Sequence, residues 1–233
     1  MTTHRPRIGI TTSFADGTQS LDQPYVLAVE AAGGLPCPVP MGANTATAAA
    51  FADVLDGLII TGGPAITEGL VGELPSDINP TDPVRRDNDR WILDAILAQR
   101  KPVLGICYGM QLLNARAGGT IFADVEAQCV GVYTHSSTRG GTTHDAAASP
   151  GTLLATLFGT EALSINTRHI QALAEPGAGY HVAMRASDGT IEAIEHENGR
   201  IFGVQFHPER MGDAMRPLFR HFVQLCRKKD ILP

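Results

Sequence analysis

The segment Gly105-Ile106-Cys107-Tyr108-Gly109 constrains the fold of this chain more than any other. It follows a short apolar run, Lys101–Leu104, and precedes a segment of helical character, Met110–Ala115. The order predicts a strand, a sharp turn at Cys107 and a helix. Glycines on both sides relieve crowding where the backbone takes an unfavourable conformation. The N-terminal dipole of the helix favours a thiolate, the reactive form of cysteine, so Cys107 is a candidate nucleophile.

Strands and helices alternate in the first half of the chain. Apolar runs and capping signals predict, in order, a strand at Arg7–Thr12, a helix at Tyr25–Ala32, a Pro-rich edge strand at Leu35–Pro40, a helix at Thr45–Leu55, a strand at Leu58–Thr61 and a helix from Asp82 or Pro83 to about Gln99. The inner face of that last helix is predicted to carry Val84, Trp91, Ile92, Ala95 and Ile96. Residues 65–83, rich in glycine and proline, read as a long surface loop. This alternation predicts an α/β fold with a mostly parallel sheet and helices on both faces.

The second half of the chain has a different pattern. Thr120–Phe122 restarts an extended segment, residues 126–150 are polar, and short β-like runs follow at Leu163–Asn166, Tyr180–Ala186, Ile191–His196 and Ile201–Phe206. Asp188-Gly189 and Asn198-Gly199 separate the last three runs and are typical of hairpin turns. We therefore expect a small antiparallel extension of the sheet, closed by an amphipathic helix at about Met215–Cys226. The whole chain, 1–233, is predicted to form a single domain.

Composition narrows the class of protein. A net charge of −6 and no concentrated basic segment argue against a nucleic-acid partner. No apolar run approaches the roughly 18 residues of a membrane helix, so no membrane partner is expected. Met1–Pro6 has no apolar stretch, so we expect no signal peptide and a cytoplasmic location. The four cysteines are scattered without a C-x-x-C pair, which predicts neither a disulfide framework nor a zinc site.

A base for Cys107 is available at the end of the last predicted strand. His207 is followed two residues later by Glu209, and Pro208 between them restricts the backbone. A cysteine nucleophile needs an imidazole nearby, and the imidazole needs a third group to orient it. The sequence therefore predicts that Cys107, His207 and Glu209 act together.

Acyl chemistry also needs N–H donors for the oxyanion of a tetrahedral intermediate. Glycines at a strand end allow close approach of the backbone, so Gly62 and Gly63 are candidates, whereas Pro64 has no N–H. The N–H of Tyr108, the residue after the nucleophile, is the other expected donor. All these residues fall at predicted carboxyl ends of strands, where open α/β sheets place their sites.

Histidines in the polar segment raise the question of a metal. His135 and His144 could form a pair of ligands, but no third ligand lies at a spacing that supports them. We therefore expect no metal, and we read both histidines as solvated or satisfied in the core.

These motifs together resemble the class I glutamine amidotransferase-like superfamily, whose members carry a Cys-His-Glu triad on a flavodoxin-like three-layer sandwich. The likeness covers nearly the whole chain, and the γ-glutamyl-γ-aminobutyrate hydrolase branch is the most similar. The segments that carry it are Pro24–Gly34, Leu55–Pro64, Asp82–Asp87, Gly105–Asn114, Asn166–Ala172, Asp188–Glu195 and Phe206–Glu209.

The resemblance implies hydrolysis of a γ-glutamyl amide, of the γ-glutamyl-amine or γ-glutamyl-γ-aminobutyrate type, through a Cys107 thioester and without a cofactor. It implies substrate contacts from Gln111, Asn166 and His169. Two positions depart from the branch near the expected substrate pocket. Tyr108 stands where the branch commonly has arginine, and Arg168-His169-Ile170-Gln171 stands where it often has His-His-Gln.

Two other readings stay open. Cys107-Tyr108-Gly109-Met110-Gln111 is reminiscent of the glutaminase domains of GMP synthetases, so the chain could supply ammonia to a separate synthetase partner. A binding or scaffold protein on this fold is the third reading, because a fold does not determine a function. The oligomeric state, a homodimer included, and any role of residues 65–83 as a lid are not determined by the sequence.

Overall fold

The computed structural model of the protein describes residues 5–227. Residues 1–4, part of the N-terminal segment from which we expect no signal peptide, lie outside the described residues. The chain divides into two compact units. The first unit runs up to Thr61 and includes Asp82–Leu104 and the chain from Gly212 on, and the second unit comprises Gly62–Thr81 and Gly105–Met211. The single-domain organisation of the chain stays a prediction.

The first unit contains the alternating strands and helices of the N-terminal half, together with the C-terminal helix. Its elements are β1 (Arg7–Thr11), β2 (Ser13–Ala15), β3 (Thr18–Ser20), α1 (Gln23–Ala31), β4 (Leu35–Val39), α2 (Thr45–Val54), β5 (Gly57–Ile60), α3 (Pro83–Ala98), the start of β7 (Val103–Ile106), the 3-10 helix η3 (Gly212–Met215) and α7 (Arg216–Arg227).

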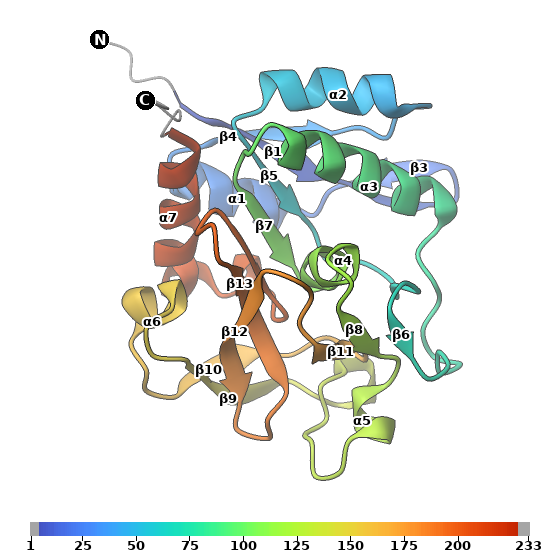
Figure 1. The fold of residues 1–233 in the computed structure, drawn as a ribbon, viewed down its shortest axis with the longest axis vertical. Helices are drawn as coiled ribbons and strands as arrows, with labels where there is room; N and C mark the ends of the chain where they lie inside the picture. Colours follow the sequence, from blue (N-terminus) through green and yellow to red (C-terminus); the bar gives the residue numbers. More distant parts are fainter. Residues whose placement is uncertain (1–4, 228–233) are drawn as a thin grey trace. The chain divides into compact units, whose positions relative to one another are not determined.

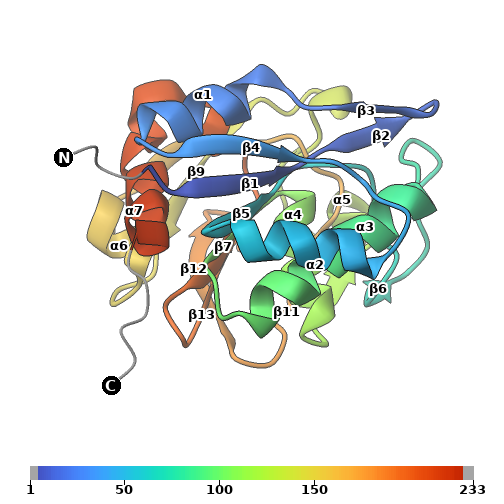
Figure 2. The same ribbon diagram turned by 90° about the horizontal axis from the view of Figure 1, so that it is seen from above.

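Parallel strands with helices on both faces form this unit, as predicted. β4 and β5 each pair with β1 in parallel register. Figure 2 shows α1 and α7 on one side of β4, β1 and β5, and α2 and α3 on the other. Helices α2 and α3 start where they were predicted to start. Asn44 accepts from two N–H groups of α2, and Asp82 accepts from the N–H of Val84 at the start of α3.

The predicted inner face of α3 is partly wrong. Ile92 and Ile96 are buried, but Val84 is 44% exposed. Arg85 turns inward instead, where its guanidinium pairs with Asp89 at 3.1 Å and donates to the Thr61 hydroxyl at 3.1 Å. A buried arginine is tolerated only when its charge and its N–H groups are satisfied. The apolar periodicity missed this because it treats every arginine as solvent-facing.

The second unit carries the elbow and the antiparallel strands. Its elements are β6 (Leu70–Val71), the end of β7, α4 (Tyr108–Arg116), β8 (Thr120–Phe122), α5 (Val125–Gln128), the 3-10 helix η1 (Ser137–Arg139), β9 (Thr143–Ala148), α6 (Leu153–Phe158), β10 (Leu163–Asn166), β11 (Ala172–Glu175), β12 (Tyr180–Ala186), β13 (Ile191–His196), β14 (Ile201–Val204) and the 3-10 helix η2 (Pro208–Arg210).

Within the described residues of this unit, antiparallel strands follow one another in the order β10-β9-β12-β13-β14. Figure 1 shows β9, β10, β12 and β13 of this group in its lower part. The polar segment 126–150, in which the sequence analysis identified no strand, contributes β9. Alternate residues of β9 are buried, including His144, Ala146 and Ala148. The buried positions of this strand are alanine and histidine, which are little more hydrophobic than its exposed positions. The alternation of buried and exposed residues therefore could not be recognised from the sequence.

Residues 65–83, predicted as a loop, are tied down at several points. Ala65 and Pro80 form a parallel bridge, and β6 pairs with β8. Gln171 accepts from the N–H of Ile66 at 2.8 Å and donates to its carbonyl at 2.9 Å. These bonds hold the segment at both ends and in the middle.

No helix within residues 5–227 is long and apolar enough to cross a membrane.

Candidate functional site

The residues described in this subsection belong to the second unit. Cys107 lies at the junction of β7 and α4, as predicted. Its backbone has φ +51° and ψ −106°, a conformation that strains a residue with a side chain. The N–H of Cys107 donates to the carbonyl of Val204 at 2.8 Å, which ties the elbow to the end of β14. The turn therefore presents the thiol at the N-terminus of α4.

Glycine is required around this elbow for steric reasons. A Cβ on Gly105 would lie 2.6 Å from the backbone carbonyl of Gly109, and a Cβ on Gly203 would lie 2.7 Å from the side chain of Met110. The missing side chain at Gly105 lets the chain turn sharply, and the missing side chain at Gly203 lets β14 approach α4. Close packing of these elements brings the end of β14, and so His207, toward Cys107.

His207 makes the contacts predicted for a general base. Its Nδ1 lies 2.7 Å from Oε1 of Glu209, whose side chain is fully buried. Burial by itself lowers the pKa of His207, but interactions with Cys107 and Glu209 outweigh burial and raise the pKa to about 10. The imidazole is therefore held in its protonated form between a thiol and a carboxylate.

Asn166 was predicted to contact substrate, and the structure places it against His207. Its side-chain N–H donates to the carbonyl of His207 at 2.8 Å, and its Oδ1 accepts from the N–H of His207 at 2.8 Å. The amide thus clamps the backbone of the histidine. Its role as a substrate contact stays a prediction.

Gln205 is a residue of this site that the sequence reading did not single out. It is fully buried, and its Nε2 lies 3.5 Å from Sγ of Cys107. Its Oε1 accepts from Nε2 of Gln111 at 3.2 Å. The available signal was a polar residue at the end of a wholly apolar strand, two positions before His207.

A cavity of about 190 Å³ opens beside Cys107. Its walls include three predicted site residues, Gly63, Gln111 and His169, together with Asp77 and Arg168, which had no predicted role. This volume is below the roughly 300–1,000 Å³ of pockets that hold drug-sized ligands, so the cavity suits a smaller molecule. Arg168 is exposed and supplies a cation to the wall.

Tyr108 is buried, with 1% of its surface exposed, and its side chain is not part of this cavity wall. The presence of tyrosine at position 108, where the branch commonly has arginine, therefore does not place an aromatic ring in the wall of this cavity. Its backbone N–H, at the first position of α4, stays the predicted oxyanion donor beside Gly62 and Gly63.

The chain is similar to known proteins over most of its length. The family model of Peptidase C26 matches residues 5–209. A Schizosaccharomyces pombe protein described as a glutamine amidotransferase is 31% identical over 227 residues, covering 94% of this chain and 85% of that protein. The γ-glutamyl-γ-aminobutyrate hydrolase PuuD of Escherichia coli (strain K12) is 29% identical and covers 90% of this chain and 87% of its own length.

The fold has a solved counterpart. A Thermoplasma acidophilum protein described as a GMP synthase subunit superimposes with a TM-score of 0.68 at 16% identity, covering 96% of this chain and 95% of that one. This likeness confirms the predicted α/β flavodoxin-like class. The resemblance to glutamine amidotransferase-like proteins is likewise confirmed by the family match and the relatives. The chain belongs to the Peptidase C26 family of glutamine amidotransferase-like proteins.

Proposed function

We propose that the protein hydrolyses a γ-glutamyl amide, releasing glutamate and an amine, with Cys107 as nucleophile. The observation that carries the proposal is the 2.7 Å contact of His207 with Glu209, at an imidazole that also interacts with the strained Cys107. This is the arrangement that acyl transfer through cysteine requires. PuuD, which is 29% identical to this chain over 230 residues, is named for a reaction of this kind.

The reaction runs in two halves. The Cys107 sulfur attacks the γ-carbonyl carbon. The resulting oxyanion accepts hydrogen bonds from the backbone N–H of Gly63 or Gly62 and from that of Tyr108. As the C–N bond breaks, His207 gives its proton to the leaving amine, and a γ-glutamyl thioester remains. His207 then takes a proton from water, which attacks the thioester carbon and releases glutamate as the C–S bond breaks. Glu209 orients His207 throughout.

The polar groups of the cavity suit a γ-glutamyl substrate. Both N–H groups of the Gln111 amide are engaged, by the carbonyl of Gln171 at 3.1 Å and by Gln205 at 3.2 Å. Its side-chain oxygen is therefore the group that accepts from the substrate ammonium. Arg168 on the wall offers a guanidinium to a carboxylate.

The test is a hydrolysis screen with glutamate release as the readout. Glutamine is compared with γ-glutamylated amines, amino acids and polyamines, using the wild type, Cys107→Ala and the control Cys129→Ala, which alters a half-buried cysteine elsewhere. Cys107→Ala is expected to lose activity entirely and Cys129→Ala to keep it. Full hydrolysis by Cys107→Ala would refute the proposal.

A glutaminase that serves a separate synthetase is the second candidate, favoured by the Cys107–Gln111 segment. It predicts weak hydrolysis of glutamine alone and a strong increase when a synthetase partner is added. Good activity on γ-glutamylamines, with no protein co-purifying, would count against it.

A further inference from the structure

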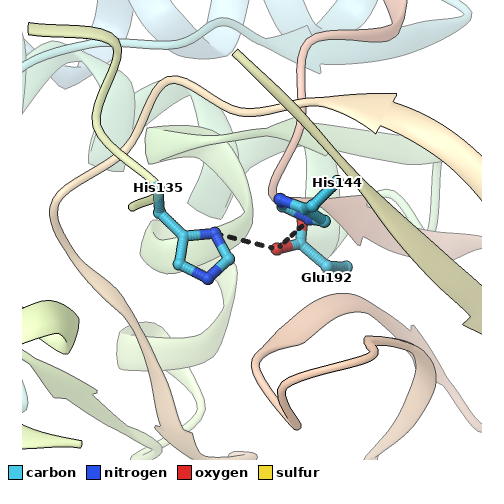
Figure 3. A group of neighbouring side chains, drawn as sticks. All are labelled: His135, His144 and Glu192. Atoms are coloured by element: carbon cyan, nitrogen blue, oxygen red, sulfur yellow. Dashed lines mark ion pairs between the residues drawn. The ribbon is translucent and has the colours of Figure 1, made fainter. Parts of the chain in front are cut away.

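Three histidines surround one buried carboxylate in the second unit. His135 precedes η1, His144 lies on β9, His169 follows β10 and Glu192 lies on β13. The side chains of all four are at most 4% exposed. Oε1 of Glu192 lies 3.2 Å from Nε2 of His144, 3.5 Å from Nε2 of His169 and 3.8 Å from Nδ1 of His135. Figure 3 shows His135 and His144 directed at the same carboxylate oxygen.

The outer nitrogens of two of these imidazoles face hydrogen-bond acceptors. Nε2 of His135 lies 2.8 Å from Oδ2 of Asp188, and Nδ1 of His169 lies 3.0 Å from the carbonyl of Gln171. For His169, whose Nε2 makes no hydrogen bond, the acceptor at Nδ1 keeps the proton of a neutral imidazole there and leaves a lone pair at Nε2. Nδ1 of His135 also lies 3.2 Å from the Thr167 hydroxyl.

Nε2 of His169 thus directs a lone pair at a carboxylate oxygen of Glu192. Within the described residues, neither oxygen of Glu192, neither nitrogen of His144, nor Nε2 of His169 takes part in a hydrogen bond. A buried carboxylate costs several kcal/mol unless positive charge satisfies it, and here the groups nearest to Oε1 are imidazole nitrogens at 3.2–3.8 Å. A cation among these atoms would satisfy all of them at once.

We propose that His135, His144 and Glu192, with His169 as a fourth ligand, bind one divalent zinc ion that stabilises the fold. The ligand atoms of the first three residues lie within 4.8 Å of one another. Tetrahedral ligands of zinc are spaced about 3.3 Å apart, since each bond measures roughly 2.0–2.1 Å. The distances of 3.2, 3.5 and 3.8 Å to Glu192 are close to that spacing.

The donor set selects the kind of ion. Imidazoles combined with one carboxylate suit zinc and neighbouring transition metals, whereas calcium and magnesium take oxygen ligands. Asp188 behind His135 and the Gln171 carbonyl behind His169 are the outer acceptors that orient metal-bound histidines. Asp188 is itself fixed by the N–H groups of Tyr133 and Thr190.

The site also reaches the cavity. His169 belongs to the wall of the cavity beside Cys107, and its Nε2 lies 3.5 Å from Oε1 of Glu192. A bound ion would therefore hold one wall of the cavity. Spacing along the chain revealed no third ligand for His135 and His144, because Glu192 is brought to them only when β13 pairs within the antiparallel strands.

The experiment measures zinc directly rather than activity. The full chain is expressed with zinc, dialysed and analysed for metal per chain, as wild type, Glu192→Gln, His144→Gln and His181→Gln. His181 is the control, because its side chain is 52% exposed and lies outside the group. All four are also made with Cys107→Ala, since a thiol beside His207 can hold zinc by itself.

We expect about one zinc per chain in the wild type, in His181→Gln and in Cys107→Ala, and roughly tenfold less in Glu192→Gln and His144→Gln. Chelation is expected to lower the melting temperature of the wild type, and cobalt is expected to give the visible absorption of a tetrahedral site. These two measurements on the wild type decide the matter if a variant does not fold. Folded wild type without zinc, which takes up neither zinc nor cobalt, would overturn the proposal and leave protonated imidazoles as the counter-charge of Glu192.

Discussion

At the scale of single residues, the site depends on the sharp backbone turn at Cys107 and on the hydrogen bonds that fix His207. Cys107 is held in a strained conformation by its bond to Val204 and by the glycines that surround it. His207 is fixed from two directions, since Asn166 clamps its backbone and Glu209 binds its ring. Such double fixation keeps the imidazole aligned while it transfers a proton.

The pH dependence of activity tests this pairing. The pKa of His207 is raised to about 10, so the imidazolium that protonates the leaving amine persists well above neutrality and is lost as the pH rises through that value. Glu209→Gln removes one of the groups that raise it. We expect the alkaline limb of the kcat/KM profile of this variant to move to lower pH, as followed by glutamate release. Glu161→Gln, a change at an exposed side chain, serves as the control. If the alkaline limb of Glu209→Gln does not move, Glu209 does not raise the pKa of His207.

At the scale of elements, one arginine joins segments that the chain separates widely. Arg139, in η1, makes paired bonds at 2.8 and 2.9 Å both to Asp77, in the segment before Pro80, and to Asp124, which caps α5. These bonds hold the pKa of both carboxyls below their usual values. Since Asp77 and Ile78 belong to the cavity wall, Arg139 sets the position of that wall.

Loss of this arginine is expected to weaken substrate binding more than it slows the chemical step. Arg139→Ala frees the Asp77 end of the wall without touching Cys107 or His207, so KM should rise severalfold while kcat changes little. Steady-state kinetics at two salt concentrations measure the effect. Arg86→Ala is the matched control, because Arg86 pairs with its neighbour Asp87 on an exposed surface. A fall in kcat with unchanged KM would contradict this role.

At the scale of the whole molecule, the C-terminal helix α7 belongs to the same unit as the N-terminal strands and helices. α7 packs with α1 in the first unit, and Phe222 on α7 is fully buried. A Cβ on Gly57 at the start of β5 would lie 2.3 Å from Sγ of Cys226 and 3.4 Å from the ring of Phe222. The C-terminal helix is therefore part of the core.

Stability should reflect this packing. Phe222→Ala is expected to lower the free energy of unfolding by about 3–5 kcal/mol, because it leaves a cavity in a close-packed core. Urea unfolding measures the change, with Leu27→Ala, at a side chain 52% exposed, as the control. Equal effects of the two substitutions would mean that α7 is not held by its buried face.

Local patterns were sufficient for most elements of the fold. The elbow at Cys107, the start of α3 at Asp82 and the hairpin turn at Asp188-Gly189 each depend on neighbouring residues of the chain. The sequence therefore predicted these features to within a few residues. The sequence reading failed where the local composition was ambiguous, as in β9, or where a charged residue turned inward, as at Arg85.

The sequence by itself determined the α/β class, the elbow at Cys107 and the identity of its partners His207 and Glu209, since these rest on local backbone preferences and on the chemistry of three residue types. Only the tertiary structure decided that Asn166 clamps His207, that Gln205 reaches the thiol and that Glu192 meets His144. These contacts join residues 41, 98 and 48 positions apart. Strand pairing and helix packing create such distant contacts, and no local pattern in a single chain encodes them.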